Sequence, residues 1–158
     1  YLRRIYDSLS ESPSTQDSMQ RCLQRSFFVS ADMAHAVHPA YKDLHQEGHQ
    51  VKVNKGLVLK TNANQRYSTT GISAAIVKQL CKDQNIPTQS FIVNQSGPCG
   101  STIGPMLSAK LGVKAIDVGM AQLGMHSIRE TCGVLDSYHY TRFMEHFYQT
   151  PLAKITYE

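Results

Sequence analysis

The sequence has few charged residues and no long apolar run. Asp, Glu, Lys and Arg make up 18% of its 158 residues, against roughly 25% in typical globular domains. This low share, beside 41% apolar residues, argues against disorder and indicates a large buried surface. No segment approaches the roughly 18 apolar residues of a membrane span, so we expect no membrane partner. The basic residues are scattered and the net charge is only +4, which gives little support to nucleic-acid binding.

Cysteine is also scarce. The four cysteines include no Cys-x-x-Cys pair of the kind found in zinc and redox sites. They are too few for a disulfide-dense scaffold of this length, so we expect reduced thiols in a cytoplasmic protein. An initiator Met and a signal-peptide pattern are both missing. Leu2, Ile5 and Leu9 already fall at helical spacing, so we expect a fragment whose first residues lie inside a helix.

Apolar runs and helical periodicity alternate along the chain. Runs with the length of buried strands are found at 27–31, 56–60, 91–93 and 113–118. Segments with helical character are found at 19–25, 72–80, 102–111 and 131–149. A polar loop is expected at 8–18 and a long irregular connection at 33–56. The alternation predicts an α/β sandwich with a mostly parallel central sheet in one domain.

Polar residues follow several of the predicted strands. Asp32 and Lys60 end two of them, and loops follow Val93 and Asp117. In parallel sheets the working residues collect beyond the carboxyl ends of the strands, so we expect these segments to meet there.

The segment after Asp32 has the residue types of a zinc site. An Asp carboxylate followed by His35 and His38 offers oxygen and nitrogen ligands that zinc accepts. The same spacing also fits a strand-end Asp that caps a turn, with both histidines on the surface. His126, in the Gly-bounded loop 119–127, is typical of a structural histidine unless the fold brings it to Asp32.

Two further features have alternative interpretations. The Gly-rich turn 97–104 lacks the Lys of a P-loop and does not fit Gly-x-Gly-x-x-Gly, so a tight turn beside a site is expected. Cys99 within it shows no arrangement that would activate a nucleophile. Lys60 would select an acidic substrate group if it lies in a cleft, and would be solvated if it lies on the surface.

Six segments, in order, resemble one family. They are 30–39, 54–60, 64–67, 99–105, 117–119 and 122–130. Together they are similar to the carboxyl-terminal part of the aspartyl aminopeptidases, zinc metallopeptidases related to vacuolar aminopeptidase I. The resemblance implies that 1–158 is the carboxyl-terminal part of a phosphorylase/hydrolase-like catalytic domain. The amino-terminal catalytic part and an inserted dimerisation domain would then be absent.

The resemblance implies an enzyme that uses two zinc ions to release an N-terminal Asp or Glu from a peptide. Asp32 matches a ligand of one zinc, and His126 matches a ligand of the other. The other ligands and the general-base Glu of the family lie upstream, and this sequence contains no Glu-Glu pair. We therefore expect no catalytic residue in this chain and no activity from it alone.

Four other residues match the substrate side of the family site. His35 and Tyr67 match residues that line it, and Lys60 matches a lysine at the substrate pocket. Lys60 would contact the acidic side chain or the tetrahedral intermediate. Gly100 lies in the matching Gly-rich turn, and we infer that its N–H donates to substrate. The segment 94–96 replaces the usual Arg-Asn-Asp of the family, and Ala40 replaces a usual Asn.

The family also implies partners. A peptide substrate, the missing amino-terminal portion and a homo-oligomer, a dodecamer, are expected. Cytoplasm is the expected compartment, with a vacuole-like compartment as the alternative. Two other functional hypotheses stay open: an inactive homologue or fragment that acts as a structural module, and an unrelated nucleotide-binding α/β domain.

Overall fold

The computed structural model describes residues 1–11, 15–94 and 96–156. Its elements in chain order are α1 (Leu2–Leu9), α2 (Gln16–Gln24), β1 (Phe27–His35), the 3-10 turn η1 (Lys42–Leu44), β2 (Leu57–Lys60), α3 (Gly71–Asp83), β3 (Thr88–Phe91), α4 (Gly104–Leu111), β4 (Lys114–Leu123), β5 (Thr131–Cys132), α5 (Val134–Gln149) and α6 (Leu152–Thr156). Strands and helices alternate through the middle of the chain, so the predicted α/β class is confirmed.

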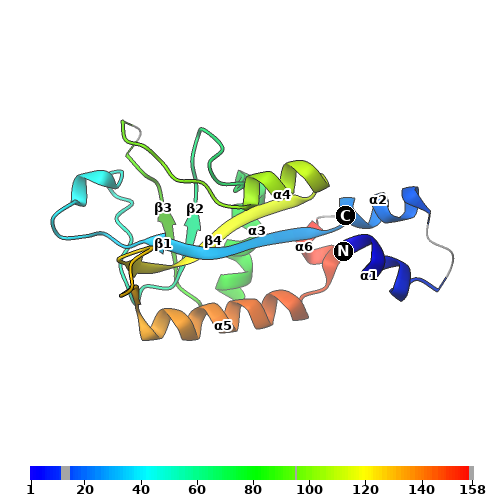
Figure 1. Ribbon diagram of the computed structural model, residues 1–158. Helices are drawn as coiled ribbons and strands as arrows, with labels where there is room; N and C mark the ends of the chain where they lie inside the picture. The colour runs from blue at the N-terminus through cyan, green and yellow to red at the C-terminus, as the bar shows by residue number, and fades with distance from the viewer. Residues whose placement is uncertain (12–14, 95, 157–158) are drawn as a thin grey trace.

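The sheet has the strand order β1-β4-β2-β3, with β5 paired to β4. β1 lies parallel to β4 along its whole length, and β2 lies parallel to β3. β2 meets β4 through a short antiparallel contact at Val58 and Leu59. Figure 1 shows the consequence: the long pair β1 and β4 crosses the molecule, and β2 and β3 run in another direction. The predicted, mostly parallel sheet is thus confirmed.

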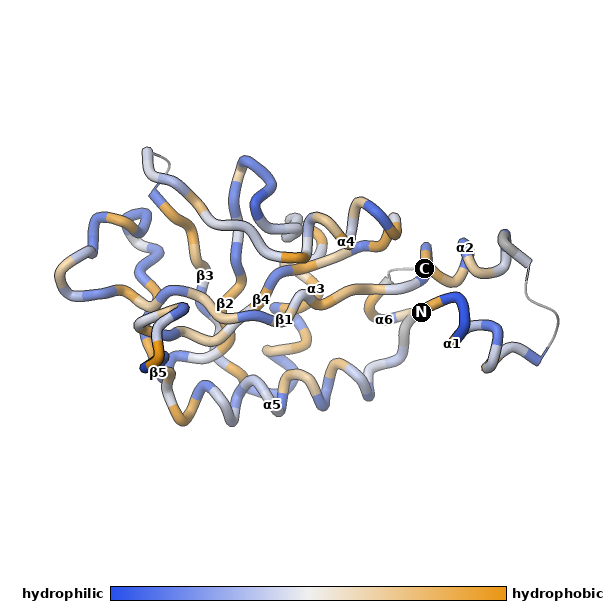
Figure 2. Tube along the Cα trace, viewed as in Figure 1, coloured by the Kyte–Doolittle hydropathy of each residue, from blue (hydrophilic) through white to orange (hydrophobic). Residues whose placement is uncertain are grey.

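Helices cover both faces of the sheet. α5 lies below β4 and α4 above it in Figure 1, and α3 packs between β4 and α5. Apolar and polar residues alternate along α5 (Figure 2), and its Phe143, Met144 and Phe147 belong to or pack against the core beside the sheet. The main core lies on this side, and its largest fully buried side chain is Phe143. The fully buried members of that core include Leu57, Leu59, Val77, Ile116 and Val118.

Two strands are longer than the apolar runs predict. β1 continues to His35 and β4 continues to Leu123, because each supplies the backbone partners of the other. Asp32 and Asp117 therefore lie inside strands, and their predicted places at strand ends are wrong. The long irregular connection accordingly begins after His35, and it contains η1.

Several other predicted boundaries are wrong by a few residues. The final helix begins at Val134 rather than Thr131, because Thr131 and Cys132 pair with the end of β4 as β5. α2 begins at Gln16, since the Thr15 side chain accepts from the Ser18 N–H in a capping box. The expected loop 8–18 is thus shorter, and its residues 12–14 lie outside the described ranges.

The amino-terminal helices lie apart from the main core. α1 forms as the spacing of its apolar residues predicts, yet it has no buried residue. Figure 1 shows α1 and α2 at the end of the molecule opposite β2 and β3. None of the helices in the described ranges has the length and apolar character that crossing a bilayer requires.

Candidate functional site

One cavity is lined by six of the residues that the sequence suggests for a site, whereas His38 lines only a neighbouring cavity. The first cavity has a volume of about 300 Å³. The six predicted residues among its lining are Asp32, His35, Lys60, Tyr67, Gly100 and His126. These residues come from β1, β2 and three separate loops, so only the tertiary fold brings them together.

The pleat of the strands places the charged residues on the cavity side. Successive side chains of a strand point to opposite faces, so Lys60 shares the face of Val58 and not that of Leu57 and Leu59. Leu57 and Leu59 belong to the main core, whereas Val58 belongs to a second apolar cluster on the other face. Gly119 keeps the strands close, because a Cβ there would lie 2.6 Å from the backbone oxygen of Asp32.

Lys60 is a buried cation that binds Asp32. Its side chain is 3% exposed, whereas that of Asp32 is 53% exposed. The Lys60 Nζ donates to Asp32 Oδ2 at 3.1 Å and to the Met33 backbone oxygen at 2.7 Å. It also lies 5.1 Å from the centre of the Tyr67 ring, within range of a cation–π contact. The ammonium therefore holds the carboxylate at the mouth of the cavity.

The surroundings of Asp32 favour its ionised form. Burial raises the pKa of Asp32, but a hydrogen bond from the Met33 N–H and the charge of Lys60 lower it. His126 lowers it further, and the net pKa lies below its usual value near 3.8. Asp32 is thus a carboxylate at neutral pH, the form that a metal ion requires.

The surroundings of His35 and Tyr67 favour their neutral forms. Burial lowers the pKa of His35, and neighbouring cationic side chains, His45 first, lower it further. Burial raises the pKa of Tyr67, and the hydrogen bond that it shares with Cys99 raises it further. The Cys99 Sγ lies 3.5 Å from the Tyr67 Oη, so the thiol donates to the phenol oxygen.

A buried carboxylate ties the loops of the cavity to β4. Asp117 is fully buried, and its Oδ2 accepts from the Ser68 N–H at 2.6 Å and the Ser68 hydroxyl at 2.7 Å. Its Oδ1 accepts from the Thr102 hydroxyl at 2.6 Å. The segment that carries Tyr67 and the Gly-rich turn that carries Gly100 are therefore fixed to one side chain.

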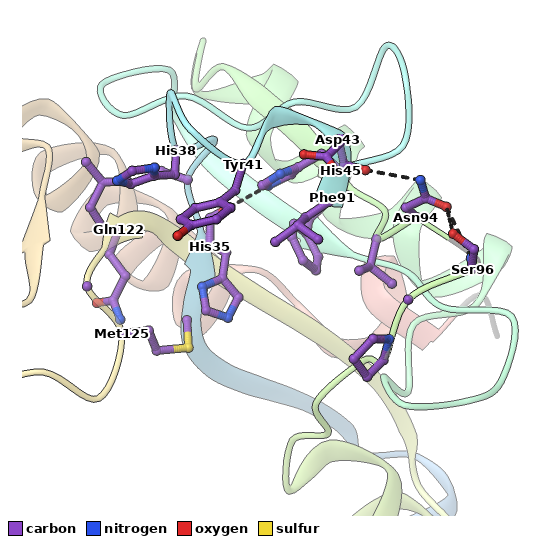
Figure 3. Close-up of a pocket in the computed structure, with 17 residues that line it drawn as sticks. His35, His38, Tyr41, Asp43, His45, Phe91, Asn94, Ser96, Gln122 and Met125 are labelled. Carbon is purple, nitrogen blue, oxygen red and sulfur yellow. Dashed lines mark hydrogen bonds between the residues drawn. The ribbon is translucent and has the colours of Figure 1, made fainter.

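A second cavity of about 500 Å³ adjoins the first. His35, Gln122 and Met125 line both cavities, and Figure 3 shows them beside the ring of Tyr41. The His45 Nε2 donates to the backbone oxygen of His35 at 3.1 Å, which joins the segment around η1 to the end of β1.

Asn94 and Ser96 of the unusual segment line this second cavity. Asn94 Nδ2 donates to the Asp43 backbone oxygen at 3.1 Å, and Asn94 Oδ1 accepts from the Ser96 N–H and hydroxyl (Figure 3). Gln95 lies outside the described residues. Asn94 thus organises the turn without the acidic residue that Ser96 replaces.

The donor set fits a metal in chemistry but is incomplete. Asp32 and His126 offer a carboxylate and an imidazole on one cavity, which are ligands that zinc accepts. Within the described part of the chain, no three His, Cys, Asp or Glu side chains gather closely enough to hold a metal ion. Further ligands must come from another polypeptide segment if zinc binds here.

Sequence reasoning gave no role to two of the lining residues. Gln122 lies in β4 and lines both cavities, and Glu130 lies beside His126 in the first. Both fall within the segment 122–130, but neither has a periodicity or spacing that distinguishes it from a surface residue. Only the close contact between Glu130 and the loop of His126 sets Glu130 apart.

Comparison with known proteins identifies the family of the chain. The sequence model of the aminopeptidase I zinc metalloprotease family (M18) matches residues 1–148. A probable aspartyl aminopeptidase of Ricinus communis is 48% identical over 151 residues, which cover 90% of this chain and 31% of that protein. An aspartyl aminopeptidase of Dictyostelium discoideum is 46% identical over 80% of this chain and 26% of its own length. The chain therefore spans about a third or less of these relatives.

Solved structures share the fold. The chain superposes on a cryo-EM structure of the Ape4 and Nbr1 complex with a TM-score of 0.88 at 38% identity, covering 94% of this chain and 28% of that one. An mApe1 dodecamer matches with a TM-score of 0.83 at 26% identity, covering 97% of this chain and 33% of that one. Because the family match extends over most of the sequence and the structures agree, the chain belongs to the M18 family of aminopeptidase I zinc metalloproteases.

Proposed function

We propose that the chain supplies the carboxyl-terminal part of the active site of an aminopeptidase that removes acidic residues from peptide N-termini. The observation that carries this proposal is the meeting of Asp32, Lys60 and His126 in one cavity. The preference for acidic residues is supported by the similarity to a probable aspartyl aminopeptidase of Ricinus communis and an aspartyl aminopeptidase of Dictyostelium discoideum.

Asp32 and His126 would each hold one of two zinc ions. The zinc pair would polarise the scissile carbonyl and generate the attacking hydroxide at neutral pH. The depressed pKa of Asp32 keeps its carboxylate ready for this role. The remaining ligands and the general-base Glu would come from the amino-terminal part of the same protein.

The chain's own residues would bind and orient the substrate. Lys60 is the buried cation of the cavity and would attract an acidic side chain while it holds Asp32. His35 is a neutral imidazole that can donate or accept one hydrogen bond, and the Tyr67 phenol lies beside Lys60. The Gly100 N–H, on the exposed turn, would donate to the substrate backbone.

Copies of the complete protein would assemble into a homo-oligomer. The mApe1 relative is a dodecamer, and a dodecamer is our proposal for this protein as well. Exposed apolar side chains in the loop before β5 and in the first turns of α5 supply a surface for contacts between subunits. They are Ile128, Val134, Leu135 and Tyr138. The four free cysteines support the cytoplasm as the compartment.

Hydrolysis of aminoacyl reporters tests the activity. The protein would be purified with any polypeptide that assembles with it and given Asp, Glu and Leu reporters. We expect faster hydrolysis of the acidic reporters, loss of activity with a chelator and recovery with zinc. An assembled protein that hydrolyses none of the three reporters would contradict the proposal.

A structural module is the second candidate. The incomplete donor set among the described residues favours it, as does the replacement of the usual acidic residue by Ser96. A stable assembly that binds no zinc and hydrolyses no reporter would establish this alternative.

A further inference from the structure

The loop that carries His126 is a short hairpin with unusual backbone geometry. It connects β4 to β5, and the pairs Gln122–Cys132 and Leu123–Thr131 close its base. Gly124 and His126 both have left-handed backbone conformations, with φ of 68° and 66°. Glycine adopts this conformation without strain, but histidine has a Cβ that disfavours it. Something must therefore hold His126 in place.

One side chain binds the backbone of His126 directly. The His126 N–H donates a hydrogen bond to the Glu130 carboxyl oxygen Oε1. The other bonds of the loop lie elsewhere: the Ser127 N–H donates to the Gly124 oxygen, and the Arg129 N–H donates to Ser127 Oγ. Glu130 is therefore the side chain whose loss would free the His126 backbone.

Glu130 also lies in the cavity that would hold the zinc ligands. Glu130 and His126 line the same cavity as Asp32. Because a left-handed residue directs its side chain differently from a β or α residue, the backbone of His126 decides where its imidazole points. A change of this conformation would move the imidazole relative to Asp32.

We propose that Glu130 is a positioning residue that fixes the left-handed backbone of His126 and so presents its imidazole to the cavity. The inference rests on the proposed function for the role of His126 as a zinc ligand. Its structural part, the control of the loop by one carboxylate, is independent of that role. Partners that orient a ligand typically contribute about 10- to 100-fold to metal affinity.

Four variants of the full chain test the proposal. Glu130→Ala removes the acceptor, and Glu130→Gln keeps an oxygen that can accept from the His126 N–H. Ser127→Ala removes a different bond of the same loop. Glu145→Ala removes an equal charge from an exposed position near the far end of α5.

The first readout is the amide signal of His126 in NMR spectra of the zinc-free chain. A hydrogen bond to a side-chain carboxyl oxygen shifts this amide proton downfield and slows its exchange with solvent. Glu130→Ala should abolish both effects, Glu130→Gln should keep part of them, and the other two variants should leave them unchanged. An unchanged His126 amide in Glu130→Ala would overturn the proposal.

The second readout is zinc affinity, measured by competition with a chromophoric chelator. Glu130→Ala should weaken binding about 10-fold or more, and Glu130→Gln should recover most of that loss. Equal losses in the Gln and Ala variants would overturn the positioning role, because they would make the carboxylate itself a zinc ligand. If the unaltered chain binds no zinc, as the incomplete donor set of its described residues allows, the amide signals alone decide whether Glu130 controls the loop.

Discussion

The substitution Lys60→Met removes the buried ammonium of the cavity and leaves an apolar side chain of similar length in its place. The substitution deletes two hydrogen bonds of a charged donor, to Asp32 and to the Met33 oxygen. Each such bond contributes about 1.5–3 kcal/mol, but removing a buried ammonium also relieves its desolvation cost. Asp32 is 53% exposed, so water can solvate its carboxylate in the variant. We expect a net loss of about 1–3 kcal/mol in the free energy of unfolding.

Urea denaturation measures this loss. With a slope of about 2 kcal/mol/M, the midpoint should fall by about 0.5–1.5 M. Lys78→Met is the matched control, since Lys78 is exposed on α3, and its midpoint should stay within about 0.3 M of the original. An equal or higher midpoint for Lys60→Met would refute the reasoning, because it would mean that burying the ammonium costs more than its contacts contribute.

The same variant changes the titration of Asp32. Lys60 helps to lower the pKa of Asp32 in the folded state, so its removal should raise that pKa. A depressed folded pKa stabilises the fold above the unfolded value near 3.8, and this stability is lost as the pH falls through the folded value. The difference in free energy of unfolding between the two proteins should therefore narrow as the pH falls below about 3.8 and through the folded pKa of Asp32. A carboxyl signal of Asp32 that titrates at the same pH in both proteins would contradict this.

Two further predictions concern groups outside the cavity. Asp136 is 1% exposed and accepts hydrogen bonds from the N–H groups of Asn54 and Gly56 at 2.6 and 2.8 Å. Asp136→Ala should therefore lower the free energy of unfolding, measured by urea denaturation, by about 2–4 kcal/mol and speed amide exchange at Asn54 and Gly56. Slow exchange of these two amides in the variant would refute this role of Asp136. Burial raises the pKa of the Cys81 thiol to about 12, so a thiol reagent at about pH 8 should leave Cys81 unmodified until the chain unfolds. The exposed Cys132 should react at once, and equal rates for the two would show that the core around Cys81 opens readily.

Local patterns were sufficient to predict the order of strands and helices, but not how far the strands extend. Leu57–Lys60 and the stripe of α3 follow directly from apolar runs and periodicity. The second half of β1 does not, because Asp32 and His35 interrupt the apolar pattern and only pairing with β4 extends the strand. The antiparallel contact of β2 with β4 is likewise a distant pairing with no local signal.

The same limit applies to the site. Taken singly, Asp32, Lys60 and His126 each fitted an ordinary surface or structural role, and only the order of the family segments pointed to a shared site. The fold now brings them to one cavity. That Lys60 would bind Asp32 and the Met33 oxygen could not be inferred, because these contacts join two strands 27 or more residues apart in the chain. The hydrogen bond that the His126 N–H donates to Glu130 spans only four residues. It depends on the left-handed backbone of His126, which no sequence pattern predicts.

Native mass spectrometry of the purified protein tests the central claim most directly, because it reports partners and metal together. The account predicts a large assembly that releases this 17.6 kDa chain together with the polypeptide that completes the site, with two zinc ions for each complete site. A large assembly that contains the completing polypeptide but neither carries zinc nor takes up added zinc would contradict the claim that the cavity around Asp32 and His126 is part of a metallopeptidase active site.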